Sequence, residues 1–108
     1  MTTPSIALSF EFDAATLAKK ERIRVSISTP YPKATGEWAC LFELAGAKDE
    51  DEKREYFGAD GFQALVLTLF YLRSLLSRLR KKGCAILDPE SGDPFYPETY
   101  FDVFTKPA

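Results

Sequence analysis

The segment from Gly61 to Lys82 constrains the fold more than any other part of the sequence. Asp60 can accept hydrogen bonds from the free amides of a helix N-terminus, and Gln63 can bond back to the Asp60 amide in a capping box. Basic side chains before Gly83 complement the negative end of the helix dipole, and the glycine suits the left-handed position that ends a helix. These signals predict a helix about 33 Å long, enough to cross a four-stranded sheet.

Apolar side chains recur along this helix at alternating spacings of three and four residues, which predicts a stripe that packs on a sheet. The stripe consists of Phe62, Leu65, Leu69, Leu72, Leu76 and Leu79. The N-terminal half is apolar on its other sides as well, through Val66, Leu67, Phe70 and Tyr71. One sheet cannot cover that many directions, so we expect the remainder to meet the C-terminal segment, a second copy of the chain or a partner. The apolar run is about half of the roughly 20 residues that a membrane span needs, so we expect no membrane insertion.

Three earlier segments alternate apolar and polar residues with the two-residue period of strands that have one buried face. The predicted buried faces are Ile6, Leu8, Phe10 and Phe12 in the first strand, Ile23, Val25 and Ile27 in the second, and Trp38, Cys40, Phe42 and Leu44 in the third. We expect a loop or one helical turn over residues 14–21 and a charged surface turn over residues 48–55. A weak fourth strand is predicted over 54–57 and a short buried strand over 84–87.

The last 14 residues, from Phe95, contain a third of the aromatic residues of the chain. Disordered segments are poor in aromatics, so this tail should pack, and we expect it on the side of the helix that the sheet leaves uncovered. The sequence therefore predicts one α+β domain over residues 1–108: an antiparallel meander of about four strands packed by one long helix, with a short strand and an aromatic C-terminal tail.

The sequence lacks the residues that several classes of catalytic and metal-binding site require. The chain has no histidine, which excludes Ser-His-Asp and Cys-His systems and HExxH metal sites. Cys40 and Cys84 form no CxxC motif, and each is expected to be a small buried side chain. The Gly58–Gly61 turn lacks a phosphate-binding motif and places Asp60 where an anion would sit. We therefore expect no catalytic residue, no metal and no cofactor.

Four carboxylates on or near the predicted strands could in principle act as general acids or bases: Glu11, Asp13, Glu37 and Glu43. Each is predicted on an exposed face or at a strand end, where acid-base chemistry is weak. The net charge of −2 argues against a general nucleic-acid binder. The first ten residues do not have the pattern of a signal peptide, so we expect a cytoplasmic protein with reduced cysteines.

A strand with the pattern W-x-C-x-F, followed by a helix that opens with G-x-D-x-x-Q-A-L, resembles a family of small uncharacterised bacterial α+β domains. The residues of this resemblance are Trp38, Phe42, Gly58, Asp60, Gln63, Ala64 and Leu65, and it spans residues 5–87. The resemblance implies the fold and a bacterial cytoplasmic origin, and it implies no activity.

Two functional classes remain. The first, which the sequence favours, is a non-enzymatic domain that binds a protein partner or itself, with an immunity protein as one concrete form. Its predicted contact residues are Asp49, Glu50, Asp51, Glu52, Phe70, Tyr71, Tyr96 and Tyr100. The alternative is a small-molecule binder or minor enzyme with a pocket between helix and sheet around Trp38 and Tyr71. A pocket needs small residues opposite these aromatics, and the sequence supplies mainly large ones.

Overall fold

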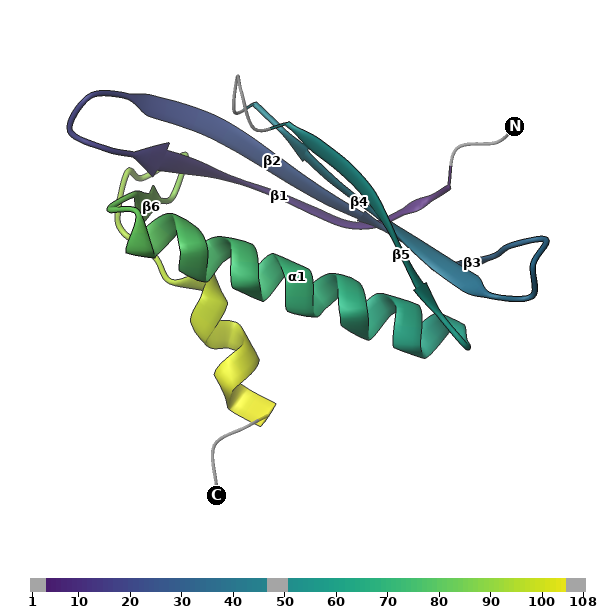
Figure 1. Cartoon of the computed structure of the whole chain (residues 1–108). Helices are drawn as coiled ribbons and strands as arrows, with labels where there is room; N and C mark the ends of the chain where they lie inside the picture. The colour runs from purple at the N-terminus through teal and green to yellow at the C-terminus, as the bar shows by residue number, and fades with distance from the viewer. Residues whose placement is uncertain (1–3, 47–50, 105–108) are drawn as a thin grey trace.

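The computed structural model describes residues 4–46 and 51–104 and shows one antiparallel sheet with one long helix packed across it (Figure 1). In chain order the elements are β1 (Ile6–Ala15), β2 (Lys20–Ser28), β3 (Tyr31–Pro32), β4 (Trp38–Ala45), β5 (Glu52–Gly58), α1 (Gly61–Lys81), β6 (Ala85–Leu87) and the 3-10 helix η1 (Pro97–Phe104). The predicted α+β architecture is confirmed. The short strand β3, which follows β2 directly, was not predicted.

The strands form a meander that α1 interrupts. β2 lies between β1 and β4, β5 lies on the other side of β4, and the two-residue β3 pairs with the start of β4. After α1, the chain returns to the opposite edge of the sheet, where β6 pairs with Asp13–Ala15 of β1. All of these pairings are antiparallel.

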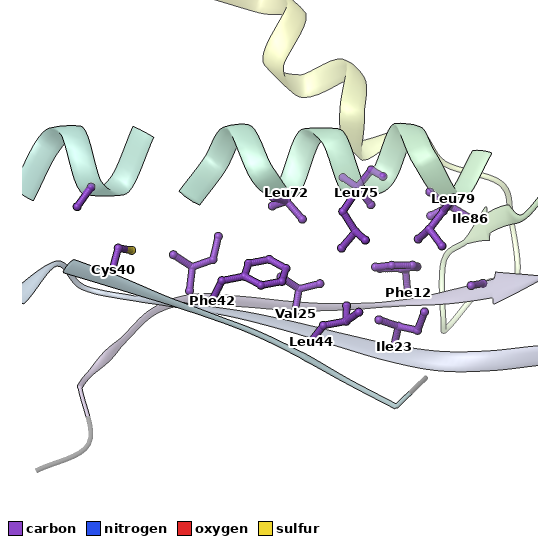
Figure 2. Packing of buried hydrophobic residues seen from close by; sticks show 14 residues of the cluster. Phe12, Ile23, Val25, Cys40, Phe42, Leu44, Leu72, Leu75, Leu79 and Ile86 are labelled. Atoms are coloured by element: carbon purple, nitrogen blue, oxygen red, sulfur yellow. The ribbon is translucent and has the colours of Figure 1, made fainter. Parts of the chain in front are cut away.

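The register places the predicted apolar residues of β2 and β4 on the face that α1 covers. Phe12 lies opposite Ile23, and Val25 lies opposite Leu44. These side chains and Phe42 are buried, and Leu72, Leu75 and Leu79 of α1 project toward them (Figure 2). The predicted burial of Cys40 is confirmed, whereas Cys84 is only partly buried.

A β-bulge corrects the prediction for the start of β1. Ile6 lies opposite Ser28 and Leu8 opposite Ile27, so one extra residue, Ala7, sits between the two pairs. Because an extra residue reverses the alternation of side chains, Ile6 turns to the face opposite Leu8. Ile6 is 64% exposed, so the prediction that it belongs to the buried face is wrong. Leu8 lies opposite the buried Ile27 and shares its face as predicted, but it is 37% exposed.

Two predicted connections are shorter than expected. Residues 14–21 mostly continue the strands, and only a tight turn remains, in which the Thr16 amide donates to the Lys19 carbonyl oxygen at 2.8 Å. The second half of the charged stretch is strand β5 rather than a turn. β5, at one edge of the sheet, therefore begins with the four charged residues Glu52, Lys53, Arg54 and Glu55.

Asp13 also differs from its prediction. It lies on the sheet face away from α1, as the alternation predicted, but it is buried. Its Oδ1 accepts a hydrogen bond from Arg22 Nε at 2.5 Å. This bond raises the pKa of the Arg22 guanidinium. Asp13 is thus a paired structural carboxylate.

The ends of α1 agree with the sequence signals. Asp60 Oδ1 accepts from the Gln63 amide at 2.8 Å, and Gly83 adopts a φ of 90° just beyond the helix. One detail differs, because Gln63 Oε1 accepts from the Ala59 amide at 2.6 Å rather than from the Asp60 amide. The return bond of the cap therefore reaches one residue further back than in a capping box.

The predicted apolar stripe of α1 is only partly the buried face. Leu72, Leu76 and Leu79 are buried as expected, but Phe62 is 77% exposed. The residues that face the sheet are Ala64, Thr68, Leu72, Leu75, Leu76 and Leu79. In the N-terminal half, Leu65 and Leu69 of the predicted stripe pack against the core but are only partly buried, and the small side chains of Ala64 and Thr68 are the fully buried ones.

Candidate protein-binding surface

Three residues four positions apart define the side of α1 that points away from the sheet. We call Phe62, Val66 and Phe70 the outer α1 face. Phe62 and Phe70 are 77% and 57% exposed, and Val66 between them is partly buried. Beside this face, Phe62, Val66, Leu67 and the cap residues Ala59 and Asp60 line a shallow hollow. Both phenylalanines of this half of the helix thus lie mostly in solvent.

The opposite side of the same half is built from small residues. Ala64 and Thr68 are fully buried, and the Thr68 hydroxyl donates to the Ala64 carbonyl oxygen at 2.9 Å. A Cβ atom added at Gly58 would lie 2.6 Å from the Ala64 amide nitrogen, so β5 and α1 meet there too closely for a side chain. This close approach places the N-terminal half of α1 on β4 and β5 and leaves Phe62 and Phe70 outside.

The C-terminal tail covers only the other half of the helix. Arg80 bonds through its guanidinium to Glu98 and to the Phe95 carbonyl oxygen, and it lies 4.2 Å from the centre of the Tyr96 ring. From this contact η1 diverges from α1 (Figure 1). The tail packs on the helix as predicted, but the expectation that it covers the whole free side is wrong, because Phe70 stays exposed.

The predicted contact residues fall into separate places. Phe70 lies on the outer α1 face, and Tyr96 and Tyr100 lie on η1, where they are 54% and 66% exposed. Asp49 and Glu50 lie outside the described residues, whereas Asp51 is exposed at the start of β5. Phe62 is not among the predicted contact residues, because the periodicity of the helix assigned it to the core.

Tyr71 and Glu52 are held inside the chain. The Tyr71 ring lies 5.0 Å from the Phe42 ring and 5.3 Å from the Tyr56 ring, centre to centre. Its hydroxyl donates to Glu52, which also pairs with Arg54 Nε at 2.9 Å. Burial and then the bond to Glu52 raise the pKa of Tyr71. Both residues join β5 to α1 and are not free to meet a partner.

These contacts also bear on the alternative pocket between helix and sheet. Tyr71 is packed between aromatic rings, and a Cβ added at Gly61 would lie 3.2 Å from the Trp38 ring. Trp38 and Tyr71 therefore have close neighbours at the place where a pocket between helix and sheet would require open space. Within residues 4–46 and 51–104 no group of three or more Cys, Asp or Glu side chains could hold a metal ion.

A second hollow lies on the sheet face away from α1. Its lining includes Tyr31, Lys33, Leu41, Lys53 and Glu55. The Tyr31 hydroxyl donates to Glu55, and Lys33 Nζ lies 3.1 Å from the same carboxylate oxygen. The bond from Tyr31 lowers the pKa of Glu55, whereas burial and then the same bond raise the pKa of Tyr31. This carboxylate is already occupied by two donors and is a poor general base.

The apolar residues of α1 raise the question of whether this helix could span a membrane. By length and composition alone, Gly61–Lys81 could cross a membrane, with a mean hydropathy of 1.2 over 18 residues, of which 33% are buried in the chain. The helix packs on β4 and β5 as the core helix of a domain does, and the leucines of its C-terminal half are buried against the sheet. The apolar excess lies in the N-terminal half.

Comparison with known proteins gives a family without a described activity. No curated protein and no solved structure matches the chain. The family model described as "Domain of unknown function (DUF6968)" matches residues 11–91, which include the whole sheet from the middle of β1 and all of α1, and the chain belongs to this family.

Proposed function

We propose that the chain is a non-enzymatic domain that binds protein through the outer α1 face. The observation that supports this is the inverted packing of the N-terminal half of α1. Ala64 and Thr68 face the sheet, whereas Phe62 and Phe70 face solvent. Burying a large apolar side chain is worth about 1.5 to 3 kcal/mol, so an isolated domain forgoes this stabilisation at two positions.

The charge distribution favours a protein as the occupant of this face. Residues 61–72 of α1 contain no charged side chain, whereas the basic residues of the helix lie in residues 73–82. An uncharged face with aromatic anchors matches the desolvated centre of protein interfaces. Nucleic acid would require cations within the contact itself, and the outer α1 face has none.

A toxin that the domain neutralises is one concrete form of such a partner. The acidic residues at the start of β5, of which Asp51 is exposed, would then steer a basic partner toward the domain. A toxin gene beside the gene for this chain would support that form.

Site-specific photocrosslinking in the native host tests the proposal. A benzophenone amino acid replaces Phe62 or Phe70, and the matched control replaces Leu17, an exposed apolar residue in the turn between β1 and β2. We expect protein adducts at positions 62 and 70 that are absent at position 17. Equal adduct patterns at all three positions, or no adduct at 62 and 70, would contradict the proposal.

A substitution pair tests the same surface by affinity. Phe70→Ser should weaken recovery of the crosslinked partner at least tenfold, because it removes an aromatic anchor. Leu17→Ser, in the turn between β1 and β2, should leave recovery unchanged. If Phe70→Ser binds like the unchanged chain, the contact lies elsewhere.

A further inference from the structure

We propose that residues 96–104, which contain η1, form a strap that opens from the folded domain and is latched in its closed position by Arg80. The closed strap packs on the C-terminal half of α1, and the open strap uncovers apolar surface there. The strap opens without a partner, so its behaviour does not depend on what the outer α1 face binds.

Three contacts at the start of the strap converge on the Arg80 guanidinium. Its Nε and one Nη atom bond to the two carboxylate oxygens of Glu98, and the second of these bonds is 3.2 Å long. The same Nη atom donates to the Phe95 carbonyl oxygen, and the guanidinium lies over the Tyr96 ring. Because a guanidinium fork fixes both the position and the charge of a carboxylate, the placement of the strap depends strongly on this one side chain.

The ion pair of the latch is largely shielded from water. The Arg80 side chain is 24% exposed and the Glu98 side chain 15% exposed. Salt screens such a pair less than a surface pair, and removal of one partner leaves the other charge incompletely solvated. We therefore expect loss of either side chain to open the strap, whereas loss of an exposed ion pair would change little.

Backbone hydrogen bonds anchor the chain before the strap but not the strap itself. The Phe95 amide donates to the Ile86 carbonyl oxygen of β6 at 3.0 Å. Among the residues that the structure describes, no backbone hydrogen bond joins residues 96–101 to α1 or to the sheet. An eight-residue 3-10 helix such as η1 is also long for its type, because its hydrogen bonds have poor geometry. The strap can therefore hinge after Phe95.

The core of the domain does not include the strap. The described residues of the buried apolar cluster run from Phe12 to Ile86, and the strap contributes only the partly buried Phe101 at its margin. Residues 11–91, which the family model matches, also end before the strap. A segment with few buried contacts opens at a lower free energy than the core, so the strap should open while α1 stays folded.

Opening would extend the apolar side of α1. Pro97 is buried and Phe101 packs against the core cluster, so both would be uncovered together with the surface beneath them. Arg80 follows Phe62 by 18 positions, which is about five helical turns. The latch therefore lies on the same side of α1 as Phe62, further along the helix.

Hydrogen exchange of the purified chain, followed by mass spectrometry, is the first test. We expect the amides of η1 to exchange at least ten times faster than those of residues 64–76 of α1, and more slowly than those of a free peptide with the sequence of the strap. Equal protection of η1 and α1 would make the strap part of one cooperative unit and would overturn the proposal. Exchange of η1 at the rate of the free peptide would also overturn it, because there would be no closed state.

Glu98→Gln tests the latch, because it keeps the size of the side chain and removes its charge. Exchange in η1 should become at least tenfold faster, whereas exchange in residues 64–76 should not change. Glu90→Gln, at an exposed position before the strap, is the matched control and should exchange like the unchanged chain. An unchanged rate in Glu98→Gln would overturn the latch.

A double variant separates the latch from a general effect of charge. The ion pair is already lost in an Arg80→Gln chain, so adding Glu98→Gln should accelerate exchange in η1 no further. Additive effects of the two substitutions would show that the side chains act separately and would overturn the latch.

Binding of anilinonaphthalene sulfonate measures the apolar surface that opening uncovers. Glu98→Gln should bind more of this dye than the unchanged chain, whereas Glu90→Gln should not. Faster exchange in η1 without added dye binding would overturn the uncovering of apolar surface. These measurements use the chain alone, so failure of the strap and failure of photocrosslinking at positions 62 and 70 are distinguishable.

Discussion

The two halves of α1 differ in apolar content, and the half that is richer in apolar residues is the less buried one. In the C-terminal half Leu72, Leu75, Leu76 and Leu79 are all buried, and Figure 2 shows the labelled leucines directed at the sheet core. In the N-terminal half Ala64 and Thr68 are fully buried, Leu65 and Leu69 are partly buried against the core, and Phe62 and Phe70 are exposed. The difference shows that apolar content alone does not decide burial.

The comparison also separates stability from binding along one helix. Large leucines facing the sheet stabilise the domain, and the tail closes over that half through Arg80. Small residues facing the sheet hold the other half close and present its aromatics outward. We therefore expect substitutions in the first half to change the free energy of unfolding and substitutions on the outer α1 face to change association.

Leu76→Ala should have the largest effect on stability. The side chain is 1% exposed, and truncating a buried leucine costs about 2 to 5 kcal/mol. Urea denaturation of the monomer measures this change in the free energy of unfolding. A cost below about 1 kcal/mol would mean that this half is not the main source of stability.

Thr68→Leu tests whether small residues are required where the N-terminal half meets the sheet. Thr68 is fully buried, so the larger side chain should overpack the contact and cost about 1 to 3 kcal/mol. Ser74→Leu adds the same side chain at an exposed position and is the control. A stabilised Thr68→Leu variant would show that the N-terminal half of α1 has room for a leucine against the sheet. The difference in packing between the two halves would then not hold.

Asp60→Ala should cost about 1 kcal/mol, because it removes the bond to the Gln63 amide at the start of α1. Thermal or urea denaturation is the measurement, with Asp93→Ala, in an exposed turn, as the control for loss of one carboxylate. A change of only a few tenths of a kcal/mol would show that Gln63 alone suffices as a cap.

Phe70→Ala should have the smallest effect on the monomer, within about 0.5 kcal/mol, because most of the ring is in solvent. The measurement is urea denaturation. A loss as large as that of Leu76→Ala would make Phe70 a core residue and end the distinction between the two halves.

The sequence predicted the elements of the fold better than their faces. Asp60 and Gly83 mark the ends of α1 through local hydrogen bonding and backbone conformation, so both were visible in the sequence. The orientation of α1 was not, because Phe62 to Leu72 is apolar on nearly every side and periodicity selected the larger residues. The close contact at Gly58 that turns Ala64 toward the sheet depends on tertiary structure.

The exposure of the candidate contact residues was likewise predicted only in part. Phe70, Tyr96 and Tyr100 were predicted from an excess of apolar surface and are exposed, whereas Tyr71 had the same signal and lies against Phe42. Which aromatic a strand covers depends on the pairing of β4 with β5. The bulge at Ala7 likewise leaves no mark in the alternation of β1.

The charged edge of β5 and the bulge in β1 set a limit on how far this chain can assemble. A sheet whose two edges both oppose pairing cannot serve as a template for fibre growth. We therefore expect the sheets of neighbouring chains to stay separate even at high concentration.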